Sequence, residues 1–141
     1  ENRSFGGAAG ASHETLYLHH HIDAAASGDR SLRRRLLEIA WHADQAAGWG
    51  ALAPPLFRAE GPPAAMAEAG ITARCMELLR YRGGRREEPV GWHGDGSTLV
   101  TMVAMLSPRG SHEGGAIELI EGTRHERHGD LDPGDVVAWR G

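Results

Sequence analysis

Two residues that can bind a metal ion, His93 and Asp95, stand two positions apart in the stretch 91–98 (GWHGDGST). Residues at i and i+2 of an extended strand point to the same face, so an imidazole and a carboxylate would converge there. One further His would complete the two-His, one-carboxylate face that holds non-haem Fe(II) and leaves other coordination positions open. The pair therefore predicts two of the three protein ligands of a metal site.

The His-x-Asp pattern alone is weak, because chance gives roughly 0.4 such pairs in a chain of this composition and the sequence contains four. The pair at 21–23 has no strand after it, and the pair at 128–130 lies at a turn. The pair at 42–44 falls in a predicted helix, where residues two apart face away from each other. Only His93 and Asp95 precede a long apolar run, at 98–106, and a Gly-Gly hairpin. Position, and not the motif itself, selects this pair.

The elements that must position the pair follow an order along the chain: the first half is mainly helical and the second half is mainly β. A short strand is predicted at 15–18, and the strongest helix at 27–49, where apolar residues recur at helical spacing. Residues 51–63 carry four of the seven Pro and are typical of a connecting loop. The region 71–82 is strand-like, although its segment 76–79 is also compatible with a helix.

Short strands then follow one another closely. They are predicted at 90–93, 98–106, 114–121, 123–128 and 136–139. This spacing favours an antiparallel sandwich or barrel behind a helical layer. The expectation is a single α+β, mainly β domain over 1–141, with lead-in and helical support at 1–70 and the β-core at 71–141.

Composition excludes several classes of function. The net charge of −4 gives no reason to expect nucleic acid or an anionic membrane as a partner. The single Cys75 cannot form an internal disulfide. No apolar run approaches the roughly 20 residues of a membrane span, and no secretory signal is visible. Both ends look cut, and the sequence does not indicate a compartment.

The order of motifs after residue 80 resembles the 2-oxoglutarate- and Fe(II)-dependent dioxygenases, most closely their prolyl 4-hydroxylase-like branch. The resemblance covers about 81–141. It is carried by His93-x-Asp95-x-Ser97, Thr101-x-x-x-Met105-Leu106-Ser107, Glu113-Gly114-Gly115 and Pro133-Gly134-Asp135-Val136-Val137. It implies a double-stranded β-helix (jelly roll), here partial, with an N-terminal helical support layer.

The resemblance also implies roles for individual residues. His93 and Asp95 correspond to metal ligands, and Tyr81 and Thr101 to contacts with 2-oxoglutarate. For Tyr81 a core or rim position is an equal alternative, and for Thr101 a polar position within a core strand is favoured. The distal His of the family, and after it the basic residue that binds the far carboxylate of 2-oxoglutarate, are expected beyond Gly141. His125 and His128 come too early for the distal role.

The implied function is hydroxylation of an unactivated C–H bond, with a prolyl residue as one option. Fe(II) would be the metal, 2-oxoglutarate and O2 the cosubstrates and ascorbate an additional reductant, with a peptide or a small molecule as substrate. A non-catalytic jelly-roll remnant with weak or no metal binding is the first alternative, and a cupin-like metal protein that uses no 2-oxoglutarate is the second. Trp92 and Trp139 are interpreted as packing residues rather than as substrate platforms. Arg85 and Arg86 are compatible both with a solvated turn and with contacts to an acidic substrate.

Overall fold

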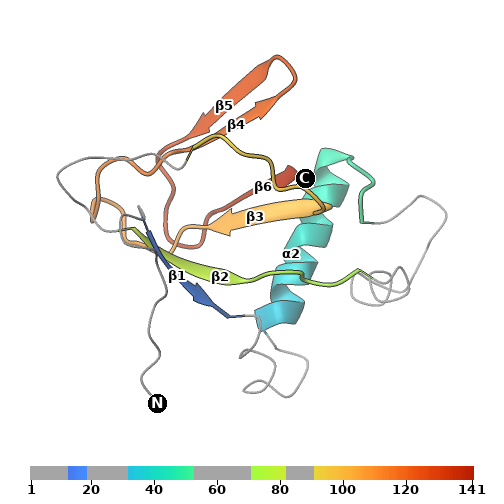
Figure 1. Ribbon diagram of the computed structural model, residues 1–141, viewed down its shortest axis with the longest axis horizontal. Helices are drawn as coiled ribbons and strands as arrows, with labels where there is room; N and C mark the ends of the chain where they lie inside the picture. Colours follow the sequence, from blue (N-terminus) through green and yellow to red (C-terminus); the bar gives the residue numbers. More distant parts are fainter. Residues whose placement is uncertain (1–12, 19–31, 53–70, 82–90) are drawn as a thin grey trace.

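The computed structural model describes residues 13–18, 32–52, 71–81 and 91–141 (Figure 1). This part of the chain is mainly β with one helix, as predicted. Its elements are β1 (His13–Tyr17), α2 (Leu32–Ala47), β2 (Glu77–Tyr81), β3 (Val100–Ala104), β4 (Ile117–Glu121), β5 (Arg124–His128) and β6 (Val136–Arg140). The strands form three antiparallel pairs, β1–β2, β3–β6 and β4–β5, and the described residues close no barrel.

Strand pairing is nested in the second half of the chain. β4 and β5 form a hairpin in which Glu121 lies opposite Arg124. Its two-residue loop begins with Gly122 at a φ of 60°, and glycine is favoured at that position of a type II′ turn. β3 pairs with β6 around this hairpin, from Val100 opposite Arg140 to Ala104 opposite Val136. In Figure 1 the hairpin stands apart from the β3–β6 pair.

Most predicted elements are present, and one is wrong. The helix predicted at 27–49 is described from Leu32 to Ala47 and is followed by Gly48 at a φ of 66°, a common helix ending. Of the region predicted as strand-like at 71–82, only Glu77–Tyr81 forms a strand, β2; residues 71–76 have no regular secondary structure, and the segment 76–79 is not helical. The strand predicted at 90–93 is not formed in its described part, because residues 91–95 have no regular secondary structure. Glycines at 91, 94 and 96 explain the difference, since glycine weakens a strand and favours turns.

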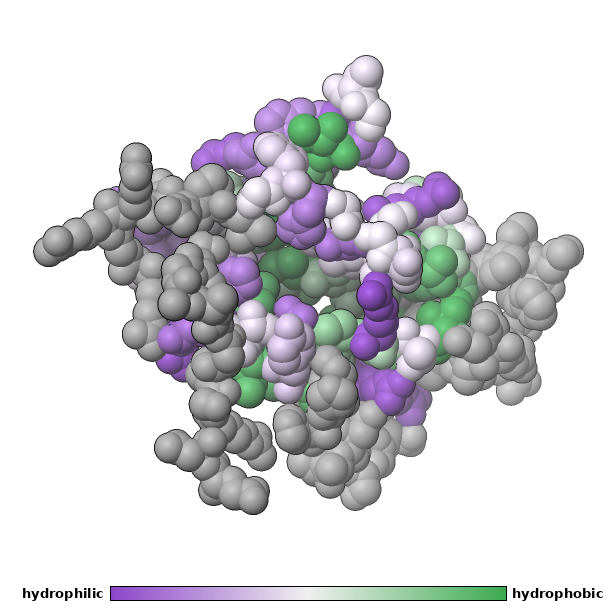
Figure 2. Space-filling view, in the orientation of Figure 1, coloured by the Kyte–Doolittle hydropathy of each residue, from purple (hydrophilic) through white to green (hydrophobic). Residues whose placement is uncertain are grey.

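The core of the described residues is small. Ala40 and Leu52 are buried, and partly buried apolar residues pack against them: Leu37, Trp41, Ile71, Val100 and Met102. Helix α2 thereby packs against β3. Figure 2 shows hydrophobic residues gathered near the hollowed centre of one face, with hydrophilic residues prominent on the β4–β5 hairpin above it. The described residues include no helix with the length and apolar character needed to cross a membrane.

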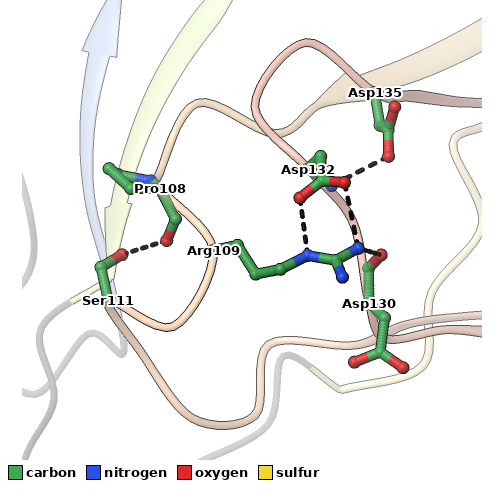
Figure 3. A network of polar contacts seen from close by, with 6 residues as sticks. All are labelled: Pro108, Arg109, Ser111, Asp130, Asp132 and Asp135. Carbon is green, nitrogen blue, oxygen red and sulfur yellow. Dashed lines mark hydrogen bonds and ion pairs between the residues drawn. The ribbon is translucent and has the colours of Figure 1, made fainter.

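A charged network fixes the turn before β6 (Figure 3). Arg109 donates from Nε to Asp132 Oδ1 at 2.6 Å and from Nη2 to Asp132 Oδ2 at 3.0 Å, and Nη2 also lies 3.3 Å from the Asp130 carbonyl oxygen. The Asp132 backbone N–H donates to Asp135 Oδ2 at 2.8 Å. Two parallel N–H···O bonds give Arg–carboxylate pairs geometric specificity. The pair therefore joins the loop after β3 to the turn that begins β6.

Replacing Arg109 with Met is expected to lower the free energy of unfolding by about 0.5–1 kcal/mol, because the pair is bidentate but largely exposed to solvent. Urea denaturation at neutral pH measures the change. Arg35→Met, at an exposed position of α2, is the matched control and should stay within about 0.5 kcal/mol of the parent. Equal losses in both variants would mean that the Arg109 pair does not stabilise this turn.

Candidate metal centre

The structure brings His93 and Asp95 together, although they lie on a loop and not on a strand. His93 Nε2 is 3.5 Å from Asp95 Oδ1. The imidazole is 62% exposed and the carboxylate 27%. The backbone between Gly91 and Thr98, rather than alternation along a strand, makes the two side chains converge.

The second ring nitrogen of His93 has its own partner. Nδ1 lies 2.8 Å from the carbonyl oxygen of Gly91, so Nδ1–H is the donor. In the neutral ring, Nε2 then carries the lone pair and faces a carboxylate oxygen. A cation shared between Nε2 and Asp95 Oδ1 would satisfy both acceptor atoms. Metal-bound histidines usually donate their other N–H to a carbonyl or carboxylate in this way.

The separation of the two atoms also suits a shared ion. Ligand nitrogen and oxygen atoms lie about 2.1 Å from a small transition-metal ion, so a 3.5 Å separation corresponds to an angle of about 110° at the ion. A right angle, as in a six-coordinate site, would need the loop to close by about 0.5 Å. The donor set and its spacing therefore fit a divalent metal, with modest closure for an octahedral one.

The loop that carries both side chains is held from both directions. Arg74 Nη1 donates to the carbonyl oxygen of Gly96 at 3.0 Å, and Thr98 Oγ1 donates to the carbonyl oxygen of Asp95 at 2.6 Å. Between these anchors Ser97 has a φ of 70°, which a non-glycine residue seldom adopts. Sequence reasoning missed Arg74, because nothing in the local pattern indicates a contact across 22 residues.

Trp92, next to His93, links the loop to the β4–β5 hairpin. Its ring meets the ring of His125 edge-on, with centroids 6.0 Å apart and an interplanar angle of 70°. His125 Nε2 lies 3.1 Å from Glu118 Oε2 and is engaged there. Trp92 remains 65% exposed, so it packs against the hairpin through this ring contact and not within the core.

The two expected 2-oxoglutarate contacts have different surroundings. Thr101, on β3, is half-buried, and its Oγ1 lies 3.1 Å from Thr98 Oγ1, so it belongs to the network that reaches Asp95. Tyr81 ends β2, and its ring contacts that of His13 at 5.3 Å between centroids. Tyr81 is 57% exposed. Partial burial, with a smaller contribution from the carboxylate of Glu77, raises the pKa of its hydroxyl.

Other sequence-based interpretations have mixed outcomes. Within the described ranges, His, Cys, Asp and Glu side chains form no group of three that would hold a metal ion. Three adjacent His at 19–21, a sequence compatible with a metal tract but more typical of a polar strand end, lie outside the described residues, as does the turn with Arg85 and Arg86. Trp139, on β6, is partly buried, in keeping with a packing role.

Comparisons with known proteins assign no family to this geometry. The chain matches no protein-family model, no curated protein and no solved structure. Function is therefore inferred from the chemistry of the loop, from strand pairing and from the order of motifs.

Proposed function

We propose that this chain is part of a 2-oxoglutarate- and Fe(II)-dependent dioxygenase domain that hydroxylates an unactivated C–H bond, with a prolyl residue among the candidate targets. The observation that carries this proposal is the 3.5 Å approach of His93 Nε2 to Asp95 Oδ1 with Nδ1 already hydrogen-bonded to Gly91. An imidazole and a carboxylate are two members of the face that binds non-haem Fe(II). The motif order after residue 80 supplies the rest of the proposal.

Nested strand pairing supports the jelly-roll part of the proposal. A jelly roll is an antiparallel ribbon rolled upon itself, so inner strand pairs are enclosed by outer ones. The β4–β5 hairpin lies within the β3–β6 pair in this sense. Fold resemblance does not by itself define an activity, so the loop that carries His93 and Asp95 remains the stronger support.

Each residue of the centre has a definite task in this proposal. Fe(II) with 2-oxoglutarate and O2 would supply the oxidation of the C–H bond, with succinate and CO2 as co-products and ascorbate as an additional reductant. His93 and Asp95 bind the ion and leave its other positions open. Thr101 is proposed to face the cosubstrate, and Tyr81 to contact it at the rim.

The third ligand is proposed to lie after Gly141. The Gly141 N–H donates to the Leu99 carbonyl oxygen at 3.3 Å, so the end of β6 lies beside the residues that follow the metal loop. A segment that continues from this position starts next to the centre. The basic residue for the far carboxylate of 2-oxoglutarate would follow further on.

For the 141-residue chain we expect weak Fe(II) binding and little or no turnover, because two protein ligands hold a divalent ion poorly. Anaerobic Fe(II) titration calorimetry and succinate detection by NMR measure the two properties. The comparison is a chain extended along its gene past Gly141, which should bind Fe(II) about 100-fold more tightly or better and form succinate. The enzyme proposal fails if no His follows within about ten residues, or no Arg or Lys beyond it. Succinate formation by the 141-residue chain at the rate of the extended chain would contradict the need for a distal ligand.

A non-catalytic jelly-roll remnant is the second candidate, favoured by the absence of a third ligand among the described residues. It predicts that the extended chain binds Fe(II) weakly or not at all and forms no succinate. A cupin-like metal protein is distinguished from both because it would bind the metal tightly with no effect of 2-oxoglutarate.

A further inference from the structure

We propose that Thr98 is a positioning residue for Asp95, and that Gly141 at the end of β6 keeps Thr98 in place. The inference rests on the proposed function, since it treats Asp95 as a metal ligand. It adds two residues that belong to no motif of the resemblance and that lie 43 positions apart in the sequence.

The hydroxyl of Thr98 both donates and accepts a hydrogen bond. Its Oγ1 donates to the Asp95 carbonyl oxygen at 2.6 Å. Its proton is therefore committed, and the contact with Thr101 Oγ1 at 3.1 Å must be one in which Thr101 donates. β3 thus orients the Thr98 hydroxyl through Thr101, and Thr98 in turn orients the backbone of Asp95.

This backbone contact sets where the carboxylate lies. The carbonyl of Asp95 and its side chain share one α-carbon, so fixing the peptide plane limits where Oδ1 can reach. Ser97, between Asp95 and Thr98, has a φ of 70°. Such a conformation costs about 1–3 kcal/mol and persists only where surrounding contacts enforce it. Loss of the Thr98 hydroxyl removes one of those contacts and lets Asp95 move away from His93.

Gly141 approaches Thr98 from β6. A Cβ atom at position 141 would lie 2.5 Å from the backbone oxygen of Thr98 and 3.0 Å from its carbonyl carbon, and it would also clash with the hydroxyl. The reason for glycine here is space, because the close neighbour is backbone that cannot rotate away. Any side chain at position 141 therefore displaces Thr98 or separates the end of β6 from Leu99.

Three variants test the proposal on the 141-residue chain, with Co²⁺ alone as the probe. Thr98→Val removes the hydroxyl at nearly constant shape, Thr98→Ser retains it, and Gly141→Ala adds the clash. Co²⁺ binds imidazole and carboxylate ligands, and its visible spectrum reports their geometry. Thr98→Val and Gly141→Ala should weaken Co²⁺ binding about tenfold, as expected for the loss of one hydrogen bond. Thr98→Ser should stay within about twofold of the parent.

Thr123→Val, in the exposed β4–β5 turn, is the matched control and should bind Co²⁺ like the parent. Parent-like affinity and spectrum in Thr98→Val, or equal losses in Thr98→Val and Thr98→Ser, would overturn the proposal while leaving the metal site intact. If circular dichroism shows that Thr98→Val is unfolded, the Gly141→Ala variant provides the test. Unchanged Co²⁺ affinity in Gly141→Ala then overturns the proposal.

A metal-free measurement separates this inference from the proposed function. If the parent chain binds no Co²⁺, the metal proposal fails for these residues. The role of Thr98 is then decided by the backbone amide NMR signals of residues 94–97. Shifts in Thr98→Val and Gly141→Ala but not in Thr98→Ser or Thr123→Val support the positioning role. Unchanged signals in all four variants refute it.

Discussion

In the proposed metal site, replacing His93 with Ala is expected to abolish the binding of a divalent metal, and Asp95→Ala is expected to do the same. Each substitution leaves a single protein ligand on the loop, since the described residues hold no group of three potential ligands. Affinity for Co²⁺ or Fe(II) should fall by at least about 100-fold. Isothermal titration under anaerobic conditions gives the affinities, and the Co²⁺ spectrum shows whether nitrogen ligation is lost.

His42→Ala is the matched control for this experiment. His42 also stands two residues before an Asp, but it lies exposed on helix α2, and its replacement should leave metal binding unchanged. Asp95→Asn adds a second check, because it keeps the size of the side chain and removes its charge. Binding that survives both His93→Ala and Asp95→Ala would place the metal elsewhere in the protein.

Replacing Asp44 with Ala is expected to lower the free energy of unfolding by about 2–4 kcal/mol, more than replacing Arg109 with Met. Asp44 is fully buried. Its Oδ1 accepts the backbone N–H of Ala51 at 2.7 Å, Oδ2 accepts from Gln45 Nε2 at 3.2 Å, and its backbone oxygen accepts the N–H of Trp49 at 3.1 Å. Without the carboxylate, the backbone N–H of Ala51 loses its hydrogen-bond acceptor next to the buried Leu52. The substitution also leaves a cavity in a small core.

Urea denaturation followed by circular dichroism measures this loss. Asp44→Asn, which keeps an acceptor for Ala51, should lose less than Asp44→Ala. Asp130→Ala removes an exposed carboxylate from another His-x-Asp pair and should change stability by less than about 0.5 kcal/mol. A loss below about 1 kcal/mol in Asp44→Ala would show that this carboxylate does not hold the end of α2 to the following turn.

Local patterns in the sequence were sufficient for much of the fold. Helical periodicity identified α2, and alternation bounded by Gly identified the β4–β5 hairpin, since the residues that determine these elements are near one another in the chain. The strand predicted at 90–93 is wrong in its described part, because a few apolar residues do not outweigh closely spaced glycines. The convergence of His93 and Asp95 was nevertheless expected, and the loop achieves it by another conformation.

The residues that hold the candidate site in place could not be predicted, because they are distant from it in the sequence. Arg74, Gly141 and His125 reach the loop or its neighbours from 20 or more residues away. Nothing in a local pattern indicates which of many Arg, Gly or His residues will do so. Trp92 shows the same limit, because its exposure depends on where the hairpin lies and not on its neighbours in sequence.

Nested pairing of β3 with β6 has a consequence for the order in which the molecule assembles. The β4–β5 hairpin closes a two-residue loop and can form within about 1–10 μs. Pairing of β3 with β6 must first bring together segments that begin at Val100 and end at Arg140, and such non-local contacts form more slowly. A preformed hairpin shortens the chain between them and lowers the entropy cost of closing it. Since Gly141 meets Thr98 only after β6 has paired, the loop with His93 and Asp95 is expected to become ordered among the last steps of folding.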